Sequence, residues 1–482
     1  MGTIRFAVAL IMAKLAILAL SITKFGGTDF PGRLALKICP DFLERIEKPV
    51  KIVGVTGTNG KTTVSNLISD CLKSMDIQVL NNSAGSNIES GIATCLVRGV
   101  SLVGREKYGT AVLEIDERAS KVIFPYVEPD ILLVTNLTRD SIMRNAHPEY
   151  IQQILTHYMP EKTKLVLNAD DLIASGVAPS NPRRFFGIAG LPGDRKVNTN
   201  LIDDYPICPD CHKRLAYEYN RYSNIGKAYC PSCGFRSPGY DYTGELLLNT
   251  PEGASRPRGK FIRISTDTRS EEFPVLHDSV FNLYNEVAAV ATLLEMGMRM
   301  VDIKTALSKQ AIIKTRYDSV RVGSINITTL LCKNKNAYAT SRVFEYINEQ
   351  PGDKEIMLLN NTLEDAKTWS ENTCWHYDCD FELLSDDRIK MVVVFGDRAW
   401  DLKFRMMLAG VPEERIACVE DYKDAPHALK YFSNDNIYVL YGTDPMKVGA
   451  EATEIAVELA KEKQSIQDRP QDRPMKERGE AA

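Results

Sequence analysis

The sequence has no excess of basic residues and so lacks the electrostatic signature of a nucleic-acid-binding protein. Its 482 residues include 59 Lys plus Arg against 63 Asp plus Glu, a formal net charge of −4. Because a polyanion is attracted by a basic surface, we expect no nucleic acid partner. Hydrophobic residues at 44% and charged residues at 25% exclude a fibrous or largely disordered chain. The length predicts two to four folded units.

A long uninterrupted apolar run is also missing. The most apolar segment, Phe6 to Leu20 (FAVALIMAKLAILAL), contains Lys14 and is shorter than the about 20 residues of an ordinary membrane span. No small-residue cleavage site follows it before Lys24. The segment therefore predicts an amphipathic or buried helix in preference to a membrane anchor, and the protein is expected in the cytoplasm.

The cysteines do not have the spacing of a disulfide framework. Seven of the eleven are scattered, and four form two Cys-x-x-Cys pairs, Cys208 with Cys211 and Cys230 with Cys233. Such usage indicates metal binding and free thiols in a reducing compartment. Eighteen residues separate the two pairs, a spacing typical of a zinc ribbon, so we predict a structural Zn²⁺ held by the four thiolates. The alternative is four free thiols on a loop, and His212 is expected to be a bystander.

The segments that are present alternate between strand and helix. A Gly-rich turn joins the apolar run KIVGVTG to a helical stretch from Thr62 to Met75. Further apolar runs predict strands at 109–115, 130–135, 164–168, 355–359, 390–395 and 437–441, with a strong helix at 282–296. This alternation is typical of an α/β fold with mostly parallel sheets covered on both faces.

Shifts in composition predict how the chain is divided. The expected parts are an N-terminal helical segment (1–49), an ATP-binding α/β domain (50–315) with an inserted zinc ribbon (202–242), a second α/β domain (316–462) and a tail (463–482). The tail repeats QDRP, is highly charged and has no aromatic residue, so it predicts disorder.

The segment TGTNGKTT between the first strand and its helix is a variant phosphate loop. Backbone N–H groups of such a loop and the helix N-terminus can surround phosphate oxygens. The nucleotide-binding residues expected here are Gly57, Thr58, Asn59, Gly60, Lys61, Thr62 and Thr63. Lys61 would reach the terminal phosphates, and the Thr62 hydroxyl is suited to Mg²⁺. Val55 stands where the strict motif has glycine, and the alternative is a glycine turn with an incidental lysine.

Polar residues follow two later strands of the same predicted sheet. Glu114 and Glu117 lie in VLEIDE, and Asn136, Arg139 and Asp140 lie in TNLTRD. Open α/β sheets bind ligands at the carboxyl ends of their strands. A nucleotide-bound Mg²⁺ needs a carboxylate there, which predicts Glu114 as its ligand, with Glu117 nearly equal. The alternative is a pair of solvated surface acids.

These motifs together resemble the ATP-dependent Mur ligases. The resemblance rests on TGTNGKTT, on NADD (168–171), on SVFNLYNEVAAV (279–290) and on CKNKNAY (332–338). More narrowly, GGTDFPGRLALKICP (26–40), the four-cysteine insertion and WHYDCDFE (375–382) are similar to the synthetase subunits of lipid II isoglutaminyl synthase. The expected fold is thus a Mur-ligase-like parallel-sheet ATPase domain with an inserted zinc ribbon and a C-terminal α/β domain.

The resemblance implies a reaction and partners. ATP would phosphorylate the α-carboxylate of D-glutamate in lipid II, and ammonia from a separate GatD-type glutaminase subunit would displace phosphate to give D-isoglutamine. Lipid II would place the enzyme at the inner membrane face. Asn282 and Asn285 would lie near the adenine, and Arg316 would face the nucleotide phosphates. On pattern alone, Asn285 is better interpreted as a helix-surface residue.

The chain departs from the resembling family near its predicted glutaminase contact. An Asp that completes a triad with the glutaminase Cys and His is expected where this chain has Asn372. Asn bears no negative charge to stabilise an imidazolium. Either Glu371 or Asp365 replaces that Asp, or coupling to the glutaminase is weakened. Tyr441 to Pro445 and Arg316 to Asp318 are loose matches as well.

Two other functions compete with this interpretation. One is a Mur-type ligase that adds an amino acid or free ammonia to a carboxylate without a glutaminase. The other is a non-catalytic nucleotide-binding scaffold that docks partners through its zinc ribbon. Intact Lys61, Thr62 and Glu114 argue against the scaffold.

Overall fold

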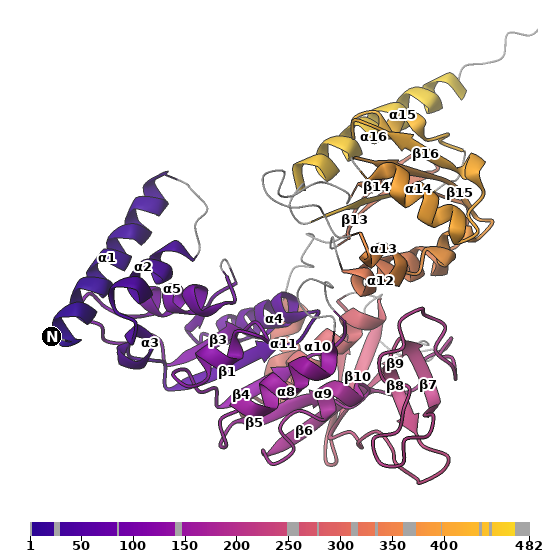
Figure 1. Ribbon diagram of the computed structural model, residues 1–482. Helices are drawn as coiled ribbons and strands as arrows, with labels where there is room; N and C mark the ends of the chain where they lie inside the picture. The colour runs from indigo at the N-terminus through magenta and orange to yellow at the C-terminus, as the bar shows by residue number, and fades with distance from the viewer. Residues whose placement is uncertain are drawn as a thin grey trace, which may run out of the picture. The chain divides into compact units, whose positions relative to one another are not determined.

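The computed structural model describes residues 2–23, 29–83, 86–139, 147–247, 260–276, 279–309, 317–332, 336–359, 373–396, 398–432, 436–442 and 446–467. The chain forms two compact units, Met1–Ile312 and Ile313–Ala482. Each unit is built on its own sheet, with helices beside it (Figure 1).

The first unit contains a nine-stranded sheet in the order β11-β10-β9-β6-β5-β4-β1-β3-β2. Its strands are β1 (Lys51–Thr56), β2 (Val79–Asn81), β3 (Thr110–Glu114), β4 (Ile131–Val134), β5 (Lys164–Asn168), β6 (Arg183–Ile188), β9 (Tyr242–Leu247), β10 (Phe261–Ser265) and β11 (Ser270–Pro274). In this sheet order, all neighbouring strands between β9 and β2 pair parallel. β10 pairs antiparallel with β9, and β11 pairs antiparallel with β10. The expected mostly parallel sheet is confirmed.

Helices cover both faces of this sheet. The described helices of this unit are α1 (Gly2–Thr23), α2 (Phe30–Ile38), α3 (Phe42–Arg45), α4 (Lys61–Ser74), α5 (Glu89–Gly99), α6 (Ser120–Ile123), α8 (Pro148–Tyr158), α9 (Leu172–Ser175), α10 (Val280–Glu295) and α11 (Met300–Lys309). Of these, α1 packs on α2, α3 and α5. Leu132 and Val134 of β4 share one core with α5, α6 and α8, whereas Leu133 is buried on the opposite face, where α10 contacts β4. The predicted helices at 62–75 and 282–296 are present as α4 and α10.

A small ribbon is inserted in the chain between β6 and β9, which are neighbours in the sheet. Strands β7 (Ala216–Tyr222) and β8 (Ile225–Tyr229) pair antiparallel as a hairpin. Its small core includes Leu215, Tyr217, Ala228 and two of the four paired cysteines. So small a core needs additional support, which a metal or a contact with the sheet supplies.

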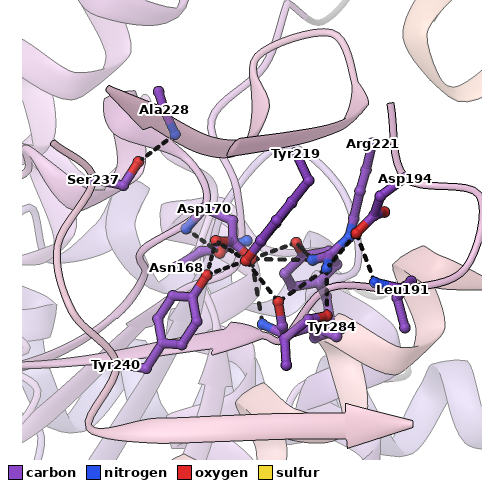
Figure 2. Close-up of polar contacts among 12 residues, drawn as sticks. Asn168, Asp170, Leu191, Asp194, Tyr219, Arg221, Ala228, Ser237, Tyr240 and Tyr284 are labelled. Atoms are coloured by element: carbon purple, nitrogen blue, oxygen red, sulfur yellow. Dashed lines mark hydrogen bonds and ion pairs between the residues drawn. The ribbon is translucent and has the colours of Figure 1, made fainter. Parts of the chain in front are cut away.

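A buried polar network joins this ribbon to the sheet (Figure 2). The carboxylate of Asp170, directly after β5, is fully buried and accepts hydrogen bonds from Tyr284 of α10 at 2.6 Å and from Tyr240 at 2.5 Å. Arg221 of β7 approaches the same carboxylate at 3.2 Å and pairs with Asp194 at 3.1 Å. The opposite charges offset each other's desolvation, so the network is stable only while all its members are present.

The second unit contains a six-stranded sheet in the order β12-β13-β17-β14-β15-β16. Its elements are β12 (Tyr317–Val322), β13 (Ile325–Leu331), α12 (Ala337–Glu349), β14 (Lys354–Leu359), α13 (Trp375–Asp378), η1 (Phe381–Ser385), β15 (Ile389–Phe395), α14 (Ala399–Leu408), η2 (Glu413–Arg415), β16 (Ile416–Val419), α15 (Ala425–Ala428), β17 (Asn436–Tyr441) and α16 (Met446–Gln467). All pairs are parallel except β12 with β13. The predicted second α/β fold is therefore present.

Helix α16 continues into the range expected as a tail. Ala452, Ala456 and Ala460 recur every four residues and are fully buried against the second sheet, and the helix ends at Gln467. One packed face is enough to carry a helix a further turn into charged sequence. Residues 468–482 lie outside the described residues.

The helix predicted at the N-terminus is present and extends beyond the apolar run that indicated it. Helix α1 has 22 residues, and Thr3–Ile22 is long and apolar enough to cross a membrane by length and composition, with 17% of that window buried. The expectation of a run too short to span was wrong because Thr3 to Arg5 and Ser21 to Ile22 extend the helix on both sides. The helix is buried along one face only, through Ala9, Leu10 and Ala13.

Candidate active site

The phosphate loop connects β1 to α4 through two glycines in the left-handed region. Gly57 has φ 126° and Gly60 has φ 85°, conformations that favour glycine. A Cβ atom at Gly57 would lie 2.2 Å from Thr135 Oγ1, and one at Gly60 would lie 2.3 Å from Asn285 Oδ1. Because α4 begins at Lys61, its N-terminal N–H groups are directed toward the loop, as in an anion site.

The segment after β4 holds the loop in place. Asn136 accepts the Thr58 N–H through its carbonyl at 2.8 Å and the Asn59 N–H through its side chain at 3.1 Å. Thr135 Oγ1 donates to the Asn59 carbonyl at 2.7 Å. The structure thus places Asn136 at the loop. Arg139 instead pairs with Asp204 at 2.6 Å, and Asp140 lies outside the described residues.

Lys61 is held inside the loop by two oxygens. Its Nζ donates to the Gly57 carbonyl at 2.6 Å and lies 2.8 Å from Oε1 of Glu117, which also accepts the Gly57 N–H at 3.1 Å. Burial alone would lower the pKa of Lys61, but the charge and hydrogen bond of Glu117 outweigh it and the pKa lies above its ordinary value. Lys61 is therefore a buried cation, suited to an incoming phosphate.

Thr62 and Glu114 lie together on the other side of the loop. The Thr62 hydroxyl donates to Oε2 of Glu114 at 2.8 Å, and Asn87 Nδ2 donates to Oε1 at 2.9 Å. A hydroxyl beside a buried carboxylate is the donor set that a nucleotide-bound Mg²⁺ uses. Of the two acids at the carboxyl end of β3, Glu114 approaches Thr62 and Glu117 approaches Lys61.

The hydrogen bonds that hold Glu114 in place were not predicted from the sequence. Asn82 accepts the Glu114 N–H at 2.8 Å and donates to the Glu114 carbonyl at 2.9 Å. Asn82 and Asn87 both follow β2, the strand that pairs with β3. The one signal available was their position after a short strand at the carboxyl edge of the sheet.

The two predicted adenine residues lie on α10. Asn282 and Asn285 are each 6% exposed, and Asn285 Nδ2 donates to Asn282 Oδ1 at 3.4 Å. The helix-surface interpretation of Asn285 was therefore wrong, because α10 is buried nearly all round and Asn285 faces Gly60 of the loop. Thr63 follows in the first turn of α4, and Arg316 lies outside the described residues.

The four paired cysteines converge in the ribbon. The sulfur atoms of Cys208, Cys211, Cys230 and Cys233 all lie within 4.8 Å of one another, and none forms a disulfide. Each pair is followed by a residue with positive φ, His212 at 60° and Gly234 at 82°, which turns the chain back at the knuckle. Four thiol sulfurs at this separation fit a structural zinc, and His212 is exposed outside the group.

The predicted triad substitutes Glu371, Asn372 and Asp365 lie outside the described residues. The nearest described motif, Trp375 to Glu382, is anchored by the buried guanidinium of Arg405, which donates to the carbonyls of His376 and Cys379 and pairs with Glu382 at 2.9 Å. Burial lowers the pKa of His376 to about 4.

Comparisons with known proteins agree with this geometry. Residues 55–188 match the Mur ligase middle domain, and residues 333–443 match the MurT ligase C-terminal domain. The lipid II isoglutaminyl synthase (glutamine-hydrolyzing) subunit MurT of Streptococcus pneumoniae R6 is 30% identical over 427 residues, 86% of this chain and 89% of that protein. The chain belongs to the MurT family of Mur ligases.

The MurT subunit of Staphylococcus aureus COL is 29% identical over 88% of this chain and 92% of its own length. Solved structures share the fold. A pseudomurein peptide ligase type C from Methanothermus fervidus has a TM-score of 0.61 at 20% identity. The match covers 87% of this chain and 81% of that one. MurF from Thermotoga maritima in complex with ADP has a TM-score of 0.54 at 15% identity. The match covers 91% of this chain and 84% of that one.

Membership in the MurT family makes the chain an ATP-dependent ligase of the synthetase-subunit type. The Mur ligase family implies ATP and Mg²⁺ as cofactors. The phosphate loop, with Lys61, Thr62 and Glu114 around it, has the chemistry that these two cofactors require.

Proposed function

We propose that this chain amidates the α-carboxylate of D-glutamate in lipid II to D-isoglutamine, using ATP and ammonia. The observation that carries the proposal is the convergence of Lys61, Thr62 and Glu114 on one phosphate loop in a chain that matches MurT subunits over most of its length. Relatives of that coverage share the name lipid II isoglutaminyl synthase subunit.

The proposed amidation has two steps, phosphorylation of the carboxylate and displacement of phosphate by ammonia. A carboxylate oxygen attacks the γ-phosphorus of ATP, the bond to the β-γ bridging oxygen breaks, and ADP leaves behind an acyl-phosphate. Ammonia then attacks the acyl carbon, phosphate departs with the activated oxygen, and the nitrogen loses a proton to give the amide. A carboxylate needs this activation because its own oxygen is a poor leaving group.

Residues of the loop neutralise charge during the first step. Lys61 exchanges Glu117 and the Gly57 carbonyl for oxygens of the transferred phosphoryl group, so its positive charge stabilises the transition state. Thr62 and Glu114 would hold Mg²⁺, which supplies further charge neutralisation. Asn282 and Asn285 would contact the adenine, because α10 brings them against the loop at Gly60. Arg316 would face the phosphates.

A GatD-type glutaminase is the proposed source of ammonia. The relatives are named as subunits of a glutamine-hydrolysing enzyme, which supports a partner chain. We propose that Glu371, Asn372 or Asp365 faces the glutaminase Cys and His. The complex would work at the cytoplasmic face of the membrane, where lipid II presents its peptide.

The chain would be organised in three parts and one metal site. The predicted parts 1–49, 50–315 with its insertion 202–242, and 316–462 would be the N-terminal helices, the ATPase domain with its ribbon, and the C-terminal domain. The four clustered cysteines would bind one structural Zn²⁺, because sulfur donors close a tetrahedral site without an open position.

An amidation assay tests the proposal. The purified chain is incubated with ATP, Mg²⁺ and lipid II, with ammonium in one tube and glutamine plus the glutaminase in another, and the product is identified by mass. We expect the carboxamide in both tubes and at least about a 100-fold loss with Lys61→Ala. Lys73→Ala, on the exposed side of the same helix, is the matched control and keeps full activity. Phosphate release without the carboxamide would reject the proposal in favour of an amino-acid ligase.

A further inference from the structure

Helix α1 carries an apolar stripe that faces away from the rest of its unit. Six side chains spaced by three or four residues lie on one side of the helix and are 46% to 73% exposed: Ile4, Val8, Ile11, Leu15, Leu18 and Ile22. Residues at this spacing share one helix face. A stripe this long, running the length of the helix, is far more than the scattered apolar residues of a normal surface.

The opposite face of α1 is held against the protein. Phe6 stacks on Phe42 of α3 with ring centroids 5.3 Å apart, and Ala9, Leu10 and Ala13 are buried. Lys14 turns inward, and its Nζ donates to the carbonyls of Val97 at 2.9 Å and Val100 at 2.8 Å at the end of α5. These contacts cover more than two turns, and α2 lies alongside α1 as well (Figure 1).

The packed face of α1 restricts how the exposed stripe can bind a partner. A helix that crosses a bilayer alone would have to release Lys14 from two carbonyls and separate Phe6 from Phe42. A helix that stays docked exposes its stripe along one side, so its partner must be a surface parallel to the helix axis. An amphipathic helix in the plane of a membrane interface buries its apolar side in this way.

Charge indicates which surface fits. Helix α1 contains no Asp or Glu, and because its Lys14 is turned inward, its outward-facing charge is Arg5. Arg5 is exposed on α1 beside the stripe. A segment that is apolar and carries only positive charge is complementary to an anionic lipid surface, which attracts basic residues close to it.

A second exposed apolar pair lies next to the helix. Leu102 and Val103 are 76% and 80% exposed in the turn that closes at Gly104. A Cβ at Gly104 would lie 3.5 Å from both Phe6 and Leu10 of α1, so the turn contacts the helix directly. Arg105 follows in the same turn and is also exposed.

We propose that the stripe of α1 docks the protein in the plane of an anionic lipid bilayer surface. The choice of lipid as occupant rests on the proposed function, because a ligase that acts on lipid II must reach a substrate embedded in a membrane. Docking through α1 would hold the phosphate loop of the same unit close to that surface for many turnovers.

Vesicle binding by the full chain tests the inference without lipid II. The protein is sedimented with vesicles of phosphatidylcholine alone or mixed with phosphatidylglycerol. We expect binding to the mixed vesicles and weaker binding to phosphatidylcholine. We expect about a tenfold or larger loss with Leu15→Glu combined with Leu18→Glu, because two exposed apolar side chains that the bilayer would bury become charged. The control combines Val197→Glu with Val301→Glu, which are equally exposed elsewhere, and is expected to bind like the wild type.

Further measurements distinguish in-plane docking from misfolding, from a membrane-spanning helix and from a dimer. ADP affinity and melting temperature must match in both double variants, which excludes misfolding. Release of the bound protein by carbonate supports in-plane docking, whereas resistance to carbonate indicates a spanning helix and overturns it. Wild-type binding that survives Leu15→Glu with Leu18→Glu also overturns it, as does a dimer lost in that variant without vesicle binding. Because these vesicles lack lipid II, failed amidation with intact binding counts against the proposed function alone.

Discussion

Lys61 Nζ lies 2.8 Å from Oε1 of Glu117, and Thr62 Oγ1 lies 2.8 Å from Oε2 of Glu114. Two acids three residues apart thus occupy two sides of one phosphate loop. Glu117 pairs with the cation that is proposed to meet the phosphates, and Glu114 pairs with the hydroxyl that is proposed to bind Mg²⁺. The division gives each acid a separate role, which single substitutions can test.

Glu114→Gln is expected to lower turnover by about 100-fold and to raise the Mg²⁺ concentration needed for half-maximal rate, because the variant removes a metal-binding charge. Phosphate release is measured across a magnesium titration. Glu117→Gln serves as the comparison and should leave the magnesium requirement unchanged. The assignment is wrong if Glu117→Gln shifts the magnesium curve and Glu114→Gln does not.

Gly60→Ala is expected to weaken ADP binding by about tenfold or more, since the added Cβ would lie 2.3 Å from Asn285 Oδ1 at a φ of 85°. Calorimetric titration with ADP gives the affinity. Gly190→Ala is the control, because nothing lies within 4 Å of its Cβ position. Equal affinities in the two variants would show that the loop does not depend on this contact.

The phosphate loop and the zinc knuckles were predictable because each is a local pattern. TGTNGKTT and the two Cys-x-x-Cys pairs place their chemistry within a few residues, and the strands around them were apolar runs with clear ends. The contact of Glu114 with Thr62 was predictable for a related reason, since the carboxyl ends of parallel strands meet at one edge.

The contacts of Asp170 were not predictable. Its partners Tyr219, Arg221, Tyr240 and Tyr284 are 49 to 114 residues away in sequence. The first three meet it because the ribbon segment folds back toward the end of β5, and Tyr284 reaches it from α10. Asn285 was misjudged for a different reason. Helix α10 is buried on nearly all sides, its polar residues included, so its sequence pattern does not reveal which side faces the loop.

Asp170→Asn is expected to lower the free energy of unfolding of the first unit by about 3 kcal/mol, because Arg221 would remain buried with its charge partly uncompensated. Urea denaturation followed by circular dichroism measures the change. Glu272→Gln, which breaks a half-exposed pair with Arg263, should cost at most about 1 kcal/mol. Similar losses in both variants would contradict a supporting role for the buried network.

Cys208→Ser and Cys230→Ser are each expected to abolish zinc binding and to lower the melting temperature, since we propose that the small ribbon core depends on a bound zinc. Metal content is measured by atomic absorption on protein purified without chelator. Cys374→Ser, at an exposed cysteine outside the group, should keep one zinc per chain. A wild-type protein without zinc would refute the metal site.

Acid is expected to destabilise the second unit through His376. Its pKa falls from 6.5 to about 4 on burial, so the folded state favours the neutral ring. The stability this contributes is complete above pH 6.5 and is lost as the pH falls toward 4, by about 3 kcal/mol in total. Denaturation at several pH values should show this loss in the wild type and a smaller one in His376→Gln. Parallel pH profiles would contradict the role of His376.

We propose that lipid II is activated by phosphoryl transfer at the Lys61 loop, which would move one carboxylate oxygen of D-glutamate into the released phosphate. Lipid II labelled with oxygen-18 in the D-glutamate α-carboxylate is incubated with the chain, ATP, Mg²⁺ and ammonium, and the released phosphate is analysed by mass spectrometry. Labelled phosphate formed together with carboxamide, and lost with Lys61→Ala, is the predicted result. Carboxamide formed with unlabelled phosphate would contradict activation of the carboxylate by phosphoryl transfer.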